Sequence, residues 1–295
     1  MRLILPLPGN EGFAGHLARA AGAELGRLET RRFPDGEHYV RIASDPGGRA
    51  VDLVCTLARA DDVILSLLFA ADAVRDLGAS EITLVAPYLG YMRQDIRFHE
   101  GEAVSSRTFA RLLSGAFDRL VTVDPHLHRY AALEEIYPIR CETLHAAGLL
   151  GDWIRQEVEA PLVIGPDAES RQWAEHVART ADAPAVVLRK TRLGDREVEI
   201  TFEDLSAFEG RRPVLIDDIA SSGRTLVAAA AELRRLGFAK PVCAVVHPLF
   251  GGDAYAEVGR VAERIVSTDS ILHPSNAIGL APLVAEGLLR GNARV

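Results

Sequence analysis

The segment Arg212–Leu233, RPVLIDDIASSGRTLVAAAAEL, decides the fold class of this chain. It begins with a short apolar run typical of a buried strand, continues into the paired carboxylates Asp217 and Asp218, and passes through a loop of small residues into a helix. A strand joined to a helix by a tight loop is typical of a parallel α/β sheet. Ligands of open α/β sheets bind beyond the carboxyl ends of the strands, so the residues that follow this strand are candidate site residues.

The chemistry of this segment suits a sugar phosphate. Two carboxylates at the end of a buried strand are costly unless something satisfies them. The hydroxyls and backbone N–H groups that open the helix suit a phosphate, and the acids suit sugar hydroxyls or a hydrated Mg²⁺. A lone Asp or Ser here would more simply cap the helix, but the combination favours a ligand. The predicted sugar-phosphate loop consists of Asp217, Asp218, Ser221, Ser222, Gly223, Arg224 and Thr225.

Apolar runs alternate with amphipathic segments along the rest of the chain. Strands are expected in RLILPLP (2–8), AVDLVCTL (50–57), EITLVAPYL (81–89) and RLVTVD (119–124), the last leading to an amphipathic HRYAALEE (128–135). The rhythm restarts with APLVIGPD (160–167) and runs to KPVCAVVHPLF (240–250). These two sets predict an α/β protein with two doubly wound parallel-sheet domains. We place the domains at 1–143 and 144–280 and expect the tail 281–295 to pack on the first.

Composition excludes several classes of protein. The 295 residues can bury a sizeable core, and 48% hydrophobic with 25% charged residues is a globular composition. No apolar run reaches the roughly 18 residues of a membrane span, and the start lacks a secretory signal, so we expect a cytoplasmic protein without a membrane partner. A net charge of −8 argues against nucleic-acid binding. The three cysteines, Cys55, Cys141 and Cys243, have neither disulfide-framework nor zinc-site spacing and are interpreted as small apolar residues.

Five motifs occur in the order found in one enzyme family. DDIASSGRT (217–225) resembles the phosphoribosyl-binding loop shared by phosphoribosyltransferases and phosphoribosyl pyrophosphate (PRPP) synthetases. The opening, GNEGFAGHLARAAGAELGRLETRRFPDGEHYVRI (9–42), resembles that of the synthetases. So do APYLGYMRQD (86–95), DRLVTVDPHLH (118–128) and the catalytic-loop segment VVLRKTRLGDREVEI (186–200). The chain is therefore identified as a member of the ribose-phosphate pyrophosphokinase family over nearly its whole length.

The resemblance implies two phosphoribosyltransferase-like domains and a transfer of the diphosphoryl group of Mg·ATP to the 1-hydroxyl of ribose 5-phosphate, which releases AMP. It also implies a homo-oligomer in which a neighbouring subunit completes the ATP site. By resemblance, ATP is bound by Phe33, Asp35 and Glu37 of the neighbour and by Arg93, Gln94 and His126. Lys190 and Arg192 are implied to close over the reacting phosphates. Mg²⁺ contacts are implied for His126 and Asp167, and ribose 5-phosphate is implied to bind the sugar-phosphate loop.

Each of these assignments has a structural alternative. Asp35-Gly36 is an ordinary hairpin turn signal, and Phe33 beside it could be a core residue. MRQDIRFHE (92–100) could be a solvated charged run, and His126 could be a structural histidine, with His128 left open. Lys190 has one further argument. The chain uses Arg for nearly all its positive charge and has only one other lysine, Lys240. A lysine at position 190 therefore indicates a site that needs the compact ammonium group and not the larger guanidinium.

Some positions depart from the family pattern. In GPDAES (165–170), Glu169 and Ser170 replace glycines that let the backbone approach a ligand closely. Pro125 interrupts a family motif, and Ser221 stands where many members have an acid. Three alternatives stay open: a paralogue acting on another pentose phosphate or nucleotide donor, a non-catalytic regulatory subunit, and a phosphoribosyltransferase. The retained Lys190, Arg192 and paired aspartates argue against the regulatory subunit, and the ATP-side motifs argue against the transferase.

Overall fold

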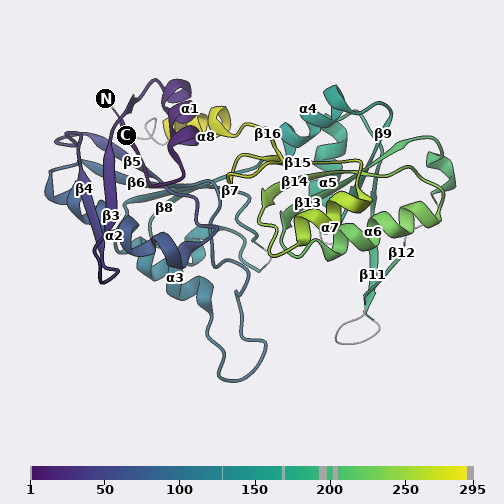
Figure 1. Cartoon of the computed structure of the whole chain (residues 1–295), viewed down its shortest axis with the longest axis horizontal. Helices are drawn as coiled ribbons and strands as arrows, with labels where there is room; N and C mark the ends of the chain where they lie inside the picture. Colours follow the sequence, from purple (N-terminus) through teal and green to yellow (C-terminus); the bar gives the residue numbers. More distant parts are fainter. Residues whose placement is uncertain (1, 128, 168–169, 193–197, 202–204, 291–295) are drawn as a thin grey trace. The chain divides into compact units, whose positions relative to one another are not determined.

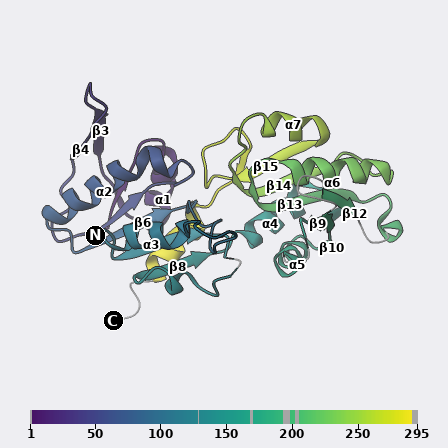
Figure 2. The ribbon, with the colours of Figure 1, turned by 90° about the horizontal axis from the view of Figure 1, so that it is seen from below.

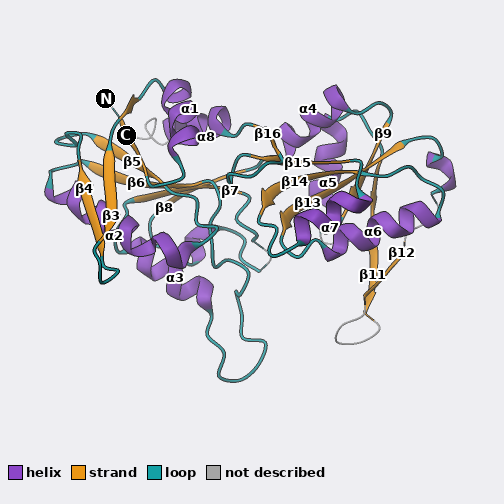
Figure 3. Cartoon of the chain, in the orientation of Figure 1, coloured by secondary structure: helices purple, strands orange, loops and turns teal. Residues whose placement is uncertain are grey.

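The computed structural model describes residues 2–127, 129–167, 170–192, 198–201 and 205–290, with the strands at 189–192 and 198–201 described by their backbone (Figure 1). The chain forms two compact units (Figure 3). The first contains Met1–Leu144, Ser270–Leu272 and Leu280–Val295, and the second contains His145–Asp269 and His273–Gly279. The C-terminal segment thus returns to the unit formed by the N-terminal half.

The first unit is built on a six-stranded sheet in the order β2-β1-β5-β6-β7-β8, with all strands parallel. The strands are β1 (Leu3–Pro6), β2 (Glu24–Leu25), β5 (Ala50–Val54), β6 (Glu81–Ala86), β7 (Arg119–Val123) and β8 (Arg140–Leu144). The helices are α1 (Glu11–Ala21), α2 (Ala60–Asp76), α3 (Ser105–Ser114) and α8 (Ala281–Arg290), of which α8 packs on α1. An antiparallel hairpin, β3 (Leu28–Arg32) and β4 (His38–Ile42), follows β2 and stands out from the sheet (Figure 2).

Burial explains why these segments form a layered sheet. The strand residues Leu3, Leu53 and Leu84 are fully buried, as is usual for parallel strands covered on both faces. Helix α2 buries Leu67, Ala70, Ala71 and Val74, the i, i+3, i+4 and i+7 positions of one helical face. Each fully buried leucine stabilises the fold by roughly 1.5–3 kcal/mol.

A buried ion pair joins the residue before β1 to the middle of β5. The guanidinium of Arg2 donates to both carboxylate oxygens of Asp52, with Nε–Oδ2 2.8 Å and Nη2–Oδ1 2.7 Å. Asp52 is fully buried and Arg2 is 9% exposed. The hydrogen bond to Asp52 raises the pKa of Arg2, which burial alone would lower. The pair therefore satisfies an otherwise costly buried charge and fixes β1 beside β5.

The second unit repeats the plan of the first. Its parallel sheet has the order β10-β9-β13-β14-β15-β16. The strands are β9 (Pro161–Gly165), β10 (Ala185–Val187), β13 (Arg212–Ala220), β14 (Val242–Pro248), β15 (Arg264–Thr268) and β16 (Asn276–Ile278). The helices are α4 (Ala147–Glu157), α5 (Arg171–Thr180), α6 (Arg224–Arg235) and α7 (Ala254–Val261). Here too a hairpin, β11 (Arg189–Arg192) and β12 (Val198–Thr201), follows the second strand. Each sheet thus has the relative order 2-1-3-4-5-6, and the predicted fold class is confirmed.

The segment 128–135 differs from the amphipathic element that its sequence suggests. Within its described residues it contains a short 3₁₀ turn, Leu133–Glu135, and no longer helix. Ala132 is extended, and the carboxylate of Glu135 accepts the backbone N–H groups of Ala131 and Ala132 at 2.6 and 3.3 Å. These side-chain hydrogen bonds satisfy donors that a helix would otherwise use and so favour the irregular backbone.

In the described part of the chain, no helix combines the length and the hydropathy that crossing a bilayer requires.

Candidate active site

The sugar-phosphate loop follows β13 in the second unit. The strand is longer than expected, because Asp217 and Asp218 still lie within it and Ile219 still pairs with His247 of β14. Pairing with β9 on the other side, however, ends at Leu215. The two half-buried aspartates therefore occupy the part of β13 that projects past β9, with side chains on opposite faces of the strand.

Gly223 shapes the turn from this strand into helix α6. It is the N-cap residue and has a left-handed backbone with φ 67°. A Cβ atom at this position would lie 2.7 Å from Cγ2 of Val258, so both the conformation and the close packing require glycine. No described side chain caps α6. The first N–H groups of a helix have no partner inside the helix, and together with the helix dipole they favour an anion at this position.

The loop after β9 contains the departure from the family pattern at Ser170. The backbone N–H of Ser170 donates to Oδ1 of Asp167 at 2.9 Å, and the Ser170 hydroxyl donates to the carbonyl of Asp167 at 2.8 Å. Gly165 is kept, and a Cβ there would lie 2.9 Å from Cβ of Ala174. Ser170 thus closes the turn with its own side chain where a glycine is expected, while Asp167 contributes an oxygen to that turn.

The two loops lie at the reversal point of the second sheet. The strand order turns at β9 and β13, which are neighbours, so the half-buried Asp167 leaves the same sheet edge as Asp217 and Asp218. Such a switch point is where open α/β sheets bind ligands. In the first unit the corresponding strands are β1 and β5. There Oδ1 of the buried Asn10 accepts the backbone N–H of Thr56 at 2.8 Å. That hydrogen bond ties the loop after β1 to the loop after β5.

Three predicted ATP-binding residues share one edge of the first sheet. Arg93 and Gln94 lie on the loop after β6, and half-buried His126 lies after the neighbouring β7. The backbone of His126 is left-handed, with φ 58°. The loop after β6 is held by the backbone N–H of Ser106, which donates to the carbonyl of Gln94 at 3.3 Å.

The other three predicted ATP-binding residues, Phe33, Asp35 and Glu37, form the exposed tip of the β3–β4 hairpin. The Asp35-Gly36 turn signal is confirmed, because Glu37 donates its N–H to Oδ1 of Asp35 at 3.1 Å and Gly36 has φ 95°. The core interpretation of Phe33 is wrong within this chain, since the residue is 37% exposed. Its ring lies under the guanidinium of Arg31, 4.4 Å from the ring centroid. The β3–β4 hairpin stands out from the first sheet (Figure 2).

Some predicted positions lie partly or wholly outside the described residues. Lys190 and Arg192 are on β11, where their backbones pair with Ile200 and Val198. Their side chains are outside the description, as are Glu169 and His128 entirely. Among the described residues, no group of three His, Cys, Asp or Glu side chains is gathered as a metal cluster.

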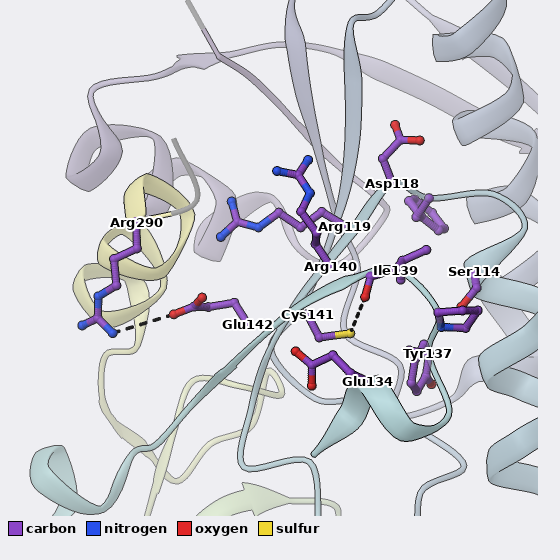
Figure 4. Close-up of a pocket in the computed structure, with 12 residues that line it drawn as sticks. Ser114, Asp118, Arg119, Glu134, Tyr137, Ile139, Arg140, Cys141, Glu142 and Arg290 are labelled. Carbon is purple, nitrogen blue, oxygen red and sulfur yellow. Dashed lines mark hydrogen bonds and ion pairs between the residues drawn. The ribbon is translucent and has the colours of Figure 1, made fainter. Parts of the chain in front are cut away.

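A cavity of about 1130 Å³ lies in the first unit (Figure 4). It borders the amino ends of β7 and β8, where Arg119 and Arg140 begin the strands. Arg140 pairs with Glu81, and Arg290 lies 3.7 Å from Glu142. Buried Arg119 donates to the carbonyls of Gly287 and Leu288 at the end of α8. Arg119, Arg140 and Arg290 thus connect β7 to α8, β8 to β6 and α8 to β8.

Asp95 directly follows Arg93 and Gln94, and the sequence predicts no role for it. It is 4% exposed and accepts a 2.7 Å hydrogen bond from Nη1 of Arg129. The position of this carboxylate directly after Arg93 and Gln94 could have indicated a role in the same loop. Its pairing with Arg129 could not be predicted, because the partner is 34 residues away in the sequence.

Comparison with known proteins identifies the family. Residues 3–116 match the N-terminal domain of ribose phosphate pyrophosphokinase, and residues 132–280 match the phosphoribosyl transferase domain. A ribose-phosphate pyrophosphokinase from Methanopyrus kandleri is 36% identical over 275 residues, which cover 92% of this chain and 93% of that protein. Another, from Methanobrevibacter smithii, is 30% identical over 299 residues, which cover 97% and 99%.

The fold has a counterpart among solved structures. Phosphoribosylpyrophosphate synthetase from Mycobacterium smegmatis superposes with a TM-score of 0.84 at 23% identity over 99% of both chains. Each unit is therefore of the phosphoribosyltransferase type. Both domain matches and the full-length relatives lead to one conclusion: the chain belongs to the ribose-phosphate pyrophosphokinase family of enzymes.

Proposed function

We propose that the protein transfers the diphosphoryl group of ATP to the 1-hydroxyl of ribose 5-phosphate and so forms PRPP and AMP. The single observation that carries the proposal is the sugar-phosphate loop at the switch point of the second sheet, where Gly223 opens an uncapped helix beside two aspartates. A phosphate suits the helix N-terminus, and sugar hydroxyls suit Asp217 and Asp218.

In the proposed reaction the 1-hydroxyl oxygen attacks the β-phosphorus of ATP. The bond between that phosphorus and the oxygen bridging to the α-phosphorus breaks, AMP leaves, and the hydroxyl proton is lost. Such transfers depend mainly on positioning and on stabilising the charge of the moving group. We assign the positioning of ribose 5-phosphate to residues 217–225, ATP contacts to Arg93, Gln94 and His126, and charge stabilisation to Lys190 and Arg192.

Mg²⁺ is the proposed cofactor. The carboxylates that leave the second sheet at one edge are oxygen donors of the kind that Mg²⁺ prefers, so the donor chemistry fits. We assign one Mg²⁺ contact to Asp167 in the second unit and another to His126 in the first, and bound Mg²⁺ would neutralise phosphate charge. One oxygen of Asp167 already accepts the Ser170 N–H, which fixes the direction of that carboxylate.

We further propose that the ATP site is shared between subunits of a homo-oligomer in the cytoplasm. Support comes from the hairpin tip, where Phe33, Asp35 and Glu37 are exposed, and from the hairpin itself, which stands out from the first sheet (Figure 2). An exposed aromatic ring backed by Arg31 suits stacking on an adenine supplied with the neighbouring subunit.

The test is phosphorus NMR of the purified protein with ATP, ribose 5-phosphate and Mg²⁺. We expect AMP and a new diphosphoryl sugar signal in equal amounts. ATP that is bound but unchanged would contradict the proposal and favour a regulatory subunit. The same assay with other pentose phosphates tests the altered substrate suggested by the Ser170 turn, and a preference for ribose 5-phosphate would exclude it.

A further inference from the structure

Phe250 has a backbone conformation that bulky residues rarely adopt. It follows β14 and has φ 35°, in the left-handed region that favours glycine. Strain of this kind persists only where the surroundings enforce it, and it concentrates at functional sites. Gly251, the next residue, could adopt such a conformation without strain. The chain instead places the strain on an aromatic residue that is 8% exposed.

The strained turn is hydrogen-bonded to the base of the sugar-phosphate loop. The backbone N–H of Phe250 donates to the carbonyl of Ala220 at 2.8 Å, and that of Gly251 donates to the carbonyl of Ser221 at 3.0 Å. From the same side, Val258 and Ala254 of α7 pack against Gly223, where an added Cβ would meet both. The segment 250–258 therefore supports the loop along its length.

These two hydrogen bonds set the direction of the loop's N–H groups. In a planar trans peptide, the carbonyl of one residue and the N–H of the next point in opposite directions. The carbonyls of Ala220 and Ser221 are directed toward Phe250 and Gly251. The N–H groups of Ser221 and Ser222 must therefore point away from that support, as a loop that receives an anion requires.

A cluster of three rings, Phe250, Tyr255 and His273, holds the Phe250 side chain in place. Its centroid lies 5.3 Å from that of Tyr255 and 5.2 Å from that of His273, and Tyr255 and His273 are 4.6 Å apart. The imidazole Nδ1 of His273 lies 2.7 Å from the hydroxyl of Ser275, and the backbone N–H of His273 donates to Oδ1 of Asn276 at 2.9 Å. Tyr255 and His273 thus form an edge-to-face pair that contacts the Phe250 ring.

We propose that Phe250, held by Tyr255 and His273, is a positioning residue that orients the sugar-phosphate loop toward the phosphate of ribose 5-phosphate. The inference rests on the proposed function and extends it to residues that do not touch the substrate. The ring contacts of Phe250 maintain the strained turn at residues 250–251. The N–H groups of this turn fix the carbonyls of Ala220 and Ser221, and these peptide orientations direct the N–H groups of Ser221 and Ser222.

The test compares steady-state constants of Phe250→Ala, Phe250→Tyr and a control, Leu233→Ala. Leu233 is fully buried in the same core cluster but lies in the last turn of α6, away from the loop. A misplaced binding group can cost on the order of 10²-fold. We expect Phe250→Ala to raise the KM for ribose 5-phosphate by roughly tenfold or more and to leave the KM for ATP within about twofold. Phe250→Tyr should keep the KM for ribose 5-phosphate near the wild-type value. Leu233→Ala should lower the stability of the protein and leave both KM values unchanged.

An unchanged KM for ribose 5-phosphate in Phe250→Ala, or an equal rise in Leu233→Ala, would overturn the proposal. If Phe250→Ala does not fold, His273→Ala removes one of the two ring contacts of Phe250 and should give a smaller rise in the KM for ribose 5-phosphate. No rise would overturn the proposal. Binding of inorganic phosphate, measured calorimetrically, separates this inference from the proposed function. Should the wild type form no AMP, the reaction is refuted, while weaker phosphate binding by Phe250→Ala would still support the positioning role and equal binding would overturn it.

Discussion

Nη1 of Arg129 lies 2.7 Å from Oδ1 of Asp95, although the two residues are on loops that follow different strands, β7 and β6. The Tyr130 hydroxyl donates to the carbonyl of Asp95 at 3.1 Å, so two adjacent residues hold the side chain and the backbone of Asp95. Arg93 and Gln94 directly precede Asp95, and His126 precedes Arg129. The ion pair therefore links the two loops to which we assign ATP contacts.

Arg129→Ala tests that link. Asp95 is 4% exposed, so losing its partner leaves a buried carboxylate unpaired. Arg129 is itself half exposed, and water can replace part of the interaction. We expect a loss of about 1–3 kcal/mol in unfolding free energy and a rise of roughly tenfold in the KM for ATP. Denaturant unfolding and steady-state kinetics measure the two effects.

Arg75→Ala is the matched control for Arg129→Ala. Arg75 is 48% exposed, as Arg129 is, but its partner Asp118 is 39% exposed and loses little when unpaired. Stability and the KM for ATP should stay close to wild type. Equal effects of the two substitutions would show that the Asp95 pair has no special role.

Lys190→Ala is expected to lower kcat by roughly 10²–10³-fold, the usual effect of removing one charge contact made in the transition state. The melting temperature should stay unchanged, because the role that we assign to Lys190 is a contact with the substrate phosphates. Lys240 is the natural control, since it is the only other lysine and its Nζ donates to the carbonyl of Arg260 at 2.9 Å. A normal kcat in Lys190→Ala would remove Lys190 from the mechanism.

Asp218→Ala should raise the KM for ribose 5-phosphate more than the KM for ATP, because we assign this half-buried carboxylate to the sugar hydroxyls. Losing a hydrogen bond to a charged group costs about 1.5–3 kcal/mol, which corresponds to roughly 10–150-fold. Asp152→Ala removes an exposed acid paired with Arg155 in the same unit and should change neither constant. An effect confined to ATP would mean that the two substrate sites are assigned in reverse.

Local sequence patterns predict most of the helices and strands of the fold. A strand and the helix after it are each indicated by the pattern of consecutive residues. Strands such as β5 and β14 and the Asp35-Gly36 hairpin could therefore be predicted. The length of β13 could not, because its last residues are held by β14 and not by their own sequence. The absence of a helix at 131–132 likewise depends on a carboxylate three to four residues ahead.

The candidate site divides in the same way. The sugar-phosphate loop could be predicted because its carboxylates, hydroxyls and glycine are consecutive. Asp95 with Arg129 and Phe250 with His273 could not be paired, since each contact joins loops from different strands. The strain at Phe250 is also invisible in a sequence, because a phenylalanine after a strand normally indicates core packing. Roles that depend on the partner's position require the folded chain.

The pKa of His273 provides a last test, in pH-dependent stability. Burial lowers this pKa below its ordinary value of 6.5, so the folded state prefers the neutral imidazole against Tyr255 and Phe250. Between the lowered pKa and 6.5 the unfolded chain binds more protons at this site than the folded one, and stability therefore rises with pH. Conversely, it falls as the pH drops below 6.5.

His273→Gln should remove this contribution, because glutamine stays neutral. We expect the unfolding free energy of the wild type to fall more steeply between about pH 7.5 and about pH 5.5 than that of the variant. Denaturant titrations at the two pH values measure the difference, and His16→Gln on the exposed side of α1 should keep the wild-type slope. Because the imidazole packs on Phe250, the same acidification should raise the KM for ribose 5-phosphate in the wild type more than in His273→Gln. Parallel slopes in all three proteins would show that the imidazole does not titrate against the fold.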